Sequence, residues 1–184
     1  MAKKGLVFIQ NEYPINNEDF LYRQIYRFIP VFGKSIKTII EVEIHKNNIC
    51  VISFYEKNKG TEKNKYKLRS NIGAGHTIAI FKACLEAYYN LDEDFALVFS
   101  AANDVGEVKE DNSRYSAYSF FLSRYFNNYD DYNTQGSIAI NTLMLYHRTF
   151  QYKDEANFFY SEFEKKVESN LNEVNDDSDK PVLY

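Results

Sequence analysis

Alternating apolar and polar residues predict a β-hairpin between residues 36 and 55. One face of the first strand carries Ile36, Thr38, Ile40, Val42 and Ile44, and the other carries Lys37, Glu41, Glu43 and His45. A period of two residues is typical of a strand. Asn47 and Asn48 can adopt the positive φ of a tight turn, and residues 49–55 favour β structure again. The sequence therefore predicts two antiparallel strands joined by this asparagine turn.

Apolar residues at helical spacing predict helices elsewhere in the chain. These helices are expected over residues 17–30, 77–90 and 113–126 and from Asp154 onward. Apolar stretches predict strands over 95–101 and 137–146, and a further strand near 66–68. Alternating helices and strands favour an α/β fold, an α+β mixture with a single mixed β-sheet flanked by helices on both faces.

Composition and charge favour one soluble domain. The chain has 184 residues, 45% of them hydrophobic, and a net charge of -4. We expect the domain over residues 1–171 and a mobile acidic tail over 172–184. The apolar run Leu6–Ile9 is too short for a secretory signal, and two cysteines are too few for a disulfide framework. The predicted location is therefore cytoplasmic, with no membrane association.

A basic stretch leading into a glycine pair is the strongest candidate ligand site. Six lysines or arginines lie between Lys57 and Arg69. The stretch is followed by Gly73, Ala74, Gly75, His76 and Thr77 at the start of a predicted helix. Backbone N–H groups at a helix N-terminus favour anions, so this loop predicts a site for a phosphate-bearing ligand. A basic surface loop with a tight turn explains the same residues without a ligand.

Residues 69–75 follow a predicted strand and open a helix, and this arrangement resembles the GNAT acyltransferase fold. In that family a Gln/Arg-x-x-Gly-x-Gly/Ala loop holds the pyrophosphate of acyl-CoA. Here Gly73 and Gly75 fit the glycine spacing, Ser70 stands where the family has Gln or Arg, and Arg69 precedes it. The resemblance implies acyl-CoA as the possible cofactor and Tyr118, on the later helix, as general acid. Glu41 or Glu43 would then be the general base, although a solvent-facing polar stripe explains them equally.

A second resemblance covers residues 77–167. The order of elements is similar to that of a family of small bacterial proteins without an established activity. The shared residues are Asn103, Asp104, Arg114, Phe121, Tyr125 and Phe126. This resemblance implies a fold and no function.

Two functions of different class follow from the sequence. The first is a non-catalytic interaction module that binds a protein partner or an anionic small ligand, and the alternative is an acyl-CoA-dependent N-acyltransferase. Nucleic-acid binding is not expected from the acidic balance of the chain, and side chains two apart on a strand are too distant to share a metal. Strands before and after the 77–90 helix that splay apart with a groove between them would favour acyl-CoA binding, and continuous pairing would count against it.

Overall fold

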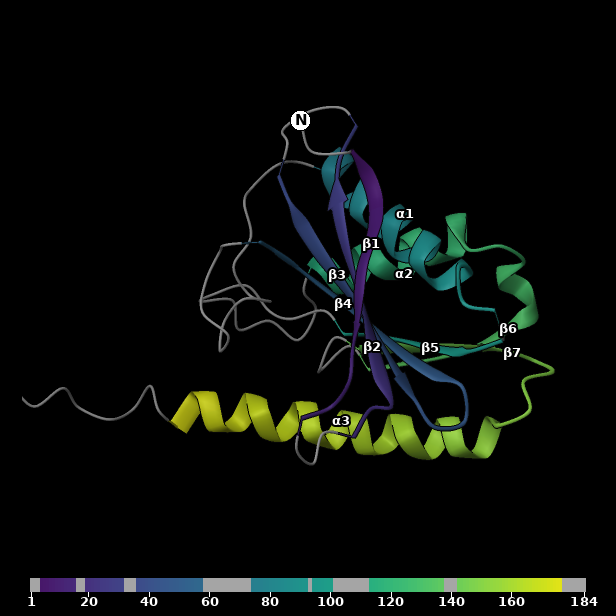
Figure 1. Ribbon diagram of the computed structural model, residues 1–184. Helices are drawn as coiled ribbons and strands as arrows, with labels where there is room; N and C mark the ends of the chain where they lie inside the picture. Colours follow the sequence, from purple (N-terminus) through teal and green to yellow (C-terminus); the bar gives the residue numbers. More distant parts are fainter. Residues whose placement is uncertain are drawn as a thin grey trace, which may run out of the picture.

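One mixed β-sheet forms the centre of the protein. The computed structural model describes residues 4–15, 19–31, 36–57, 74–92, 94–100, 113–137 and 142–176. The strands are β1 (Gly5–Glu12), β2 (Tyr22–Ile29), β3 (Thr38–His45), β4 (Ile49–Glu56), β5 (Ala96–Ser100), β6 (Tyr132–Ser137) and β7 (Thr142–His147). Their order in the sheet is β1-β2-β3-β4-β5-β7-β6 (Figure 1). β4 and β5 pair in parallel, and the other neighbours pair antiparallel.

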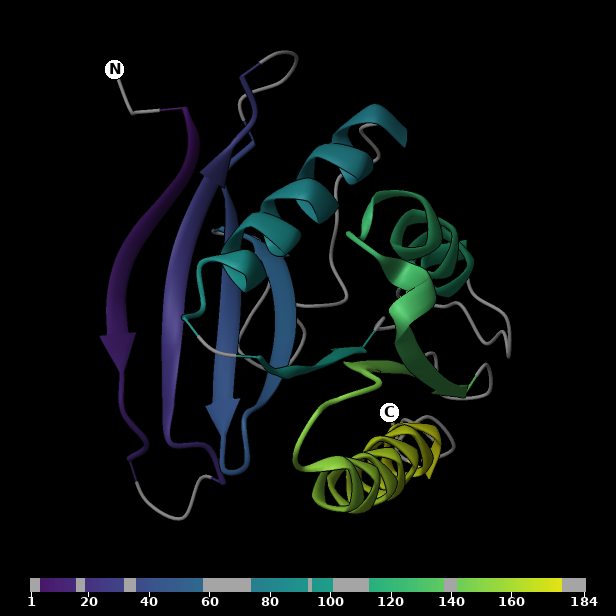
Figure 2. The same cartoon turned by 90° about the vertical axis from the view of Figure 1, so that its right-hand side faces the viewer.

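Helices cover both faces of this sheet. They are α1 (Ala74–Tyr89), α2 (Ser113–Tyr125), the short 3-10 helix η1 (Tyr129–Asp131) and α3 (Lys153–Asp176). Cys50 and Ile52 of β4 pack with α1 and α2, whereas the alternate residues Ile49 and Val51 pack with α3. Successive side chains of a strand point to opposite faces, so α3 lies across the sheet from α1 and α2 (Figures 1 and 2). The expected single mixed sheet with helices on both faces is confirmed.

A strand, β2, replaces the helix expected over residues 17–30. Tyr22–Ile29 forms β2, which pairs with β1 on one side and β3 on the other. Side chains on both faces of β2 are buried, among them Ile25 and Tyr26. A strand with two buried faces shows no alternation of polar and apolar residues, so the helical spacing of its apolar residues was misleading.

The hairpin expected over 36–55 is confirmed as β3 and β4. Asn47 and Asn48 adopt φ values of 60° and 53° in the turn between them. The expected helices 77–90 and 113–126 and the strand 95–101 are confirmed as α1, α2 and β5.

One expectation for the C-terminal third needs correction. The single inner strand expected over 137–146 is instead an antiparallel pair, β6 and β7, in which β6 is a polar edge strand. The helix expected from Asp154 is α3, which ends at Asp176. The remaining tail, 177–184, and the strand expected near 66–68 lie outside the described residues.

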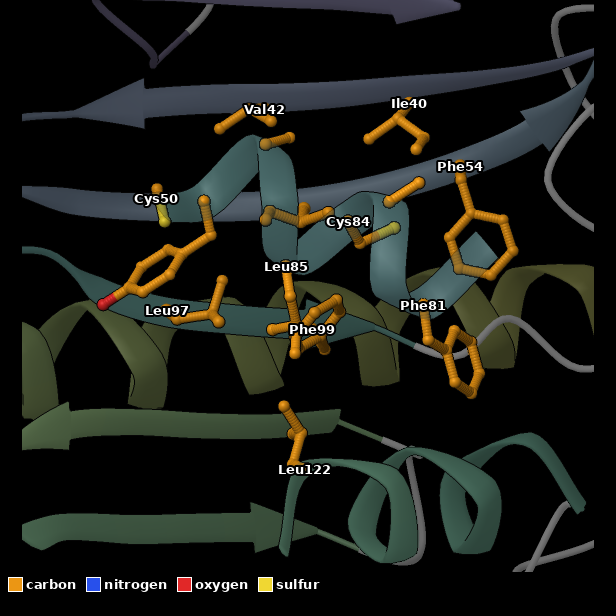
Figure 3. Packing of buried hydrophobic residues seen from close by; sticks show 14 of the residues in the cluster. Ile40, Val42, Cys50, Phe54, Phe81, Cys84, Leu85, Leu97, Phe99 and Leu122 are labelled. Carbon is orange, nitrogen blue, oxygen red and sulfur yellow. The ribbon is translucent and has the colours of Figure 1, made fainter. Parts of the chain in front are cut away.

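The main core fills the space between the sheet and the pair α1 and α2. Figure 3 shows how side chains of α1, such as Phe81 and Leu85, meet those of β4 and β5, such as Phe54 and Leu97. A smaller core forms beneath α3 and includes Met144 and Tyr160. No helix among the described ranges is long and apolar enough to cross a membrane.

A buried hydrogen bond anchors α3 to β7, and its removal tests this packing. The hydroxyls of Thr142 and Tyr160 lie 2.8 Å apart, and both residues are fully buried. We expect Tyr160→Phe to lower the free energy of unfolding by about 1–3 kcal/mol, because Thr142 loses its partner. The double variant with Tyr160→Phe and Thr142→Val should lose less free energy of unfolding than the sum of the losses of the two single variants, as measured by urea denaturation. Tyr152→Phe is the control, and an equal loss there would contradict this interpretation.

Candidate functional site

The parallel strands β4 and β5 pair over a short length and then diverge. Residues 49–52 of β4 pair with residues 96–99 of β5. β4 continues through Ser53–Glu56 beyond its last pair with β5, Ile52 with Phe99, whereas Ser100 of β5 still pairs with Thr142 of β7. In Figure 2 the teal β5 runs at a steep angle to the blue β4. The two strands therefore separate beyond Phe99, and aromatic side chains occupy the space between them on the side of α1 and α2.

An aromatic cluster fills the divergence on the side of α1 and α2. The ring of Tyr118 lies 6.3 Å from that of Phe54 on β4 and 5.6 Å from that of Phe99 on β5. It also contacts Phe81 of α1, with ring centroids 4.5 Å apart. Figure 3 shows Phe54, Phe81 and Phe99 converging on this space. Tyr118 is only 5% exposed, so it acts as a wedge that closes one side of the divergence.

The first turn of α1 lies near the end of β4. Phe81 contacts Phe54 near the end of β4. At the other end of α1, the Tyr88 hydroxyl donates a 2.8 Å hydrogen bond to the carbonyl oxygen of Phe95, just before β5. α1 therefore runs antiparallel to both strands. The backbone N–H groups in the first turn of α1 have no partner within the helix, and they lie at the end of α1 that is nearer to Ser53–Glu56.

The predicted ligand loop is partly described. Arg69 and Gly73 lie outside the described residues, and Ala74 begins α1. Gly75 is exposed, and a Cβ added there would have no heavy atom within 4 Å. His76 and Thr77 are half-buried. The first turn thus presents open space at Gly75, as an anion site requires.

The structure does not bring Glu41 and Glu43 together with Tyr118. Glu41 is 3% exposed and stands opposite Ser53 in the sheet, on the face that α3 covers in part. Tyr118 packs against Phe54, the next residue of β4, whose side chain points to the other face. A glutamate of β3 and Tyr118 therefore face opposite sides of the sheet.

Glu43 belongs to a polar network that joins three strands and α3. Arg23 Nε and Nη2 donate hydrogen bonds to Glu43 Oε1 at 3.0 and 2.5 Å. Arg23 Nη1 also lies 3.8 Å from Glu12 Oε2. His45 Nε2 lies 3.8 Å from Glu43 Oε2, and its ring packs 4.7 Å from that of Phe159 in α3. Burial raises the pKa of Glu43, but hydrogen bonds and charges from His45 and Arg23 outweigh this and hold the pKa below its usual value.

This network predicts acid-dependent stability. The pKa of Glu43 is lower in the folded than in the unfolded state, so ionised Glu43 stabilises the fold fully above its unfolded pKa of about 4.3. This contribution is lost as the pH falls through the folded pKa. We expect Glu43→Gln to lower the free energy of unfolding at neutral pH by about 1.5–3 kcal/mol. The difference in the free energy of unfolding between wild type and Glu43→Gln, measured by urea unfolding, should shrink below about pH 4. A difference that stays constant down to low pH would contradict this role.

Glu56 is a candidate that sequence analysis missed. It is buried, at 5% exposure, and lies two residues after Phe54, so the two side chains share the face that Tyr118 covers. Its cross-strand neighbour is Thr38, whose buried Oγ1 has no hydrogen-bond partner among the described residues. The predicted hairpin ended at residue 55. Extending the alternation of the predicted hairpin by one residue would have placed the Glu56 carboxylate at the end of β4.

A second concave site lies between the outer surfaces of α1 and α2. A pocket of about 330 Å³ is lined by Lys82, Leu85, Glu86, Tyr89, Asn90 and Tyr125. Lys82 Nζ lies 4.8 Å from the centroid of the Tyr125 ring. This pocket is an exposed aromatic surface near the C-terminal end of α1, away from the first turn.

Metal and thiol chemistry find no support in the described parts of the chain. No group of three or more His, Cys, Asp or Glu side chains there could hold a metal ion. Cys50 and Cys84 are buried, and burial raises the pKa of the Cys50 thiol, which disfavours the reactive thiolate.

Comparison with known proteins adds no functional assignment. No protein-family model, curated protein or solved structure matches this chain. The function must therefore be inferred from the geometry of the site.

Proposed function

We propose that the chain is a binding module for acyl-CoA, received where β4 and β5 diverge. One observation carries this proposal: the pairing of β4 with β5 ends at Ile52 and Phe99, although Ser100 of β5 still pairs with Thr142 of β7. α1 begins near the end of β4 that lies beyond this last pair. The strand order, with one diverging parallel pair joined through a helix, also supports the resemblance to the GNAT acyltransferase fold.

The two parts of the ligand match two features of the site. The amide-containing pantetheine arm is extended and can form hydrogen bonds with a strand edge, as added strands do. The pyrophosphate suits the N–H groups of the first turn of α1, where Gly75 leaves open space. Tyr118 would form the floor beneath the arm, because it closes the divergence on the helical side.

A charge placed at Gly75 tests the phosphate contact. Gly75→Glu adds a carboxylate to the first turn of α1, where the helix dipole favours a negative charge, so folding stability should not fall. The same charge repels a pyrophosphate, and we expect the affinity for acetyl-CoA to drop about tenfold or more. Isothermal titration of acetyl-CoA into wild type and variant measures this change.

Gly75→Gln is the matched control, since it has nearly the same shape without the charge. It should retain acetyl-CoA binding within a few-fold of wild type. Absence of binding by the wild-type protein at millimolar acetyl-CoA would contradict the proposal, and so would equal losses in both variants.

Acyl transfer to an amine is a second candidate, favoured by the shared face of Glu56 and Tyr118. The amine nitrogen would attack the thioester carbonyl, so that a C–N bond forms and the C–S bond breaks. The Glu56 carboxylate would accept the proton lost by the amine, and the Tyr118 hydroxyl would donate one to the departing thiolate. Both side chains lie on the side of Phe54, unlike Glu41 and Glu43.

Binding and transfer can be separated by conservative substitutions. With an amine substrate that wild type acylates, Glu56→Gln and Tyr118→Phe should each lower the transfer rate about 100-fold or more. Acetyl-CoA affinity should change little in both variants. Glu43→Gln serves as the control, because Glu43 faces the other side of the sheet, and an equal loss of transfer there would contradict these roles.

A further inference from the structure

The pocket between α1 and α2 presents two tyrosine rings that the protein holds in place. Its volume of about 330 Å³ is at the lower end of the range for small-molecule sites. Tyr89 and Tyr125 line it and are 43% and 37% exposed, whereas Leu85, which also lines it, is buried. The Tyr89 hydroxyl accepts a 2.9 Å hydrogen bond from the backbone N–H of Asn127. The Tyr125 ring stacks on that of Phe121, with centroids 4.8 Å apart.

One of these rings already attracts a cation of the protein itself. Lys82 Nζ lies over the Tyr125 ring, 4.8 Å from its centroid. The guanidinium carbon of Arg124 lies 6.0 Å from the same centroid. Cations within about 6 Å of a ring centroid are attracted to the negative face of an aromatic ring. The aromatic wall of the pocket therefore favours positive charge.

A carboxylate without a partner lies beside these rings. Glu86 lines the pocket and is exposed, and its carboxylate has no ion pair or hydrogen bond with the residues that the structure describes. Lys82 is four residues earlier on α1, a spacing at which opposite charges can pair, but its ammonium lies over Tyr125. Glu86 is also in the last turn of α1, which contains no basic residue and is the negative end of the helix dipole.

We propose that this pocket binds a small organic ammonium ion. The ion pairs with the Glu86 carboxylate, and its alkyl groups contact Leu85 and the faces of Tyr89 and Tyr125. At Tyr125 it takes the place of the Lys82 ammonium, which is free to move into solvent because Lys82 is exposed. An anion would meet the Glu86 carboxylate and the negative end of the helix dipole, and a hydrated metal ion would gain nothing from the apolar surface.

This inference does not rest on the binding of acyl-CoA. Gly75 precedes Glu86 by eleven residues, so the two sites are about 16 Å apart along α1. Gly75→Glu should therefore leave ammonium binding unchanged, and Glu86→Gln should leave acetyl-CoA binding unchanged. Failure of one proposal is thus distinguishable from failure of the other.

Choline and its neutral analogue 3,3-dimethylbutan-1-ol test the preference for a cation. The two molecules have nearly the same shape, but a carbon atom replaces the charged nitrogen in the alcohol. Titration of each into the full chain, followed by the NMR resonances of the backbone amides, measures the two affinities. We expect choline to shift the resonances of residues 82–90 and to bind about tenfold or more tightly than the alcohol.

Substitutions of the two charged residues should change choline affinity in opposite directions. Glu86→Gln should lower it about threefold or more, because the ion pair is lost. Lys82→Met should raise it about threefold or more, because no internal cation competes for the Tyr125 ring. Tyr89→Leu should lower the affinity more than Tyr89→Phe does, because only leucine removes the ring. Lys165→Met, an exposed lysine on α3 across the sheet, is the control and should leave the affinity unchanged.

Three results would overturn the proposal. The first is that millimolar choline shifts no resonance among residues 82–90. The second is that the neutral alcohol binds as tightly as choline, which would make the pocket an apolar site without preference for charge. The third is that Lys82→Met weakens choline binding as much as Glu86→Gln does, because a competing cation cannot have that effect.

Discussion

The end of pairing between β4 and β5 is the constraint on which the rest of the structure depends. β5 remains paired with β7 where it has left β4, so the sheet divides into a part formed by β1–β4 and a part formed by β5, β7 and β6. Tyr118 contacts rings from both parts, Phe54 of β4 and Phe99 of β5. On the opposite face, α3 packs against residues of β4, β5 and β7 and holds the two parts together. The divergence is thus a supported feature of the fold.

The two faces of the sheet carry different chemistry. On the side of α3, the contacts of Arg23, Glu43 and His45 link β2, β3 and α3, which suits a structural role. On the side of α1 and α2, the end of β4 carries Glu56 next to an aromatic cluster.

The sequence predicted the elements with strong local patterns. The hairpin of β3 and β4 has clear alternation and two asparagines with positive φ, and both features were visible in the sequence. β2 was mistaken for a helix because both of its faces are buried, a fact that depends on its position inside the sheet. β6 was missed because a polar edge strand has no apolar pattern.

The site was only partly predictable. Gly75 was identified from its position at a helix start, and the structure leaves open space there. Glu41 and Tyr118 were expected to act together as general base and general acid, which requires both side chains to lie on one face of the sheet. That face changes with a single residue of register, which is set by pairing between distant strands. Glu56 was missed because the end of β4 could not be located to within one residue.

Hydrogen exchange of the backbone amides, measured with and without acetyl-CoA, tests the central claim most directly. We expect acetyl-CoA to slow exchange over Ser53–Glu56 of β4 and over the first turn of α1. Exchange over residues 49–52, which already pair with β5, should change little. Slower exchange confined to residues 82–90, which line the pocket between α1 and α2, would contradict it. Unchanged exchange throughout the chain would contradict it as well.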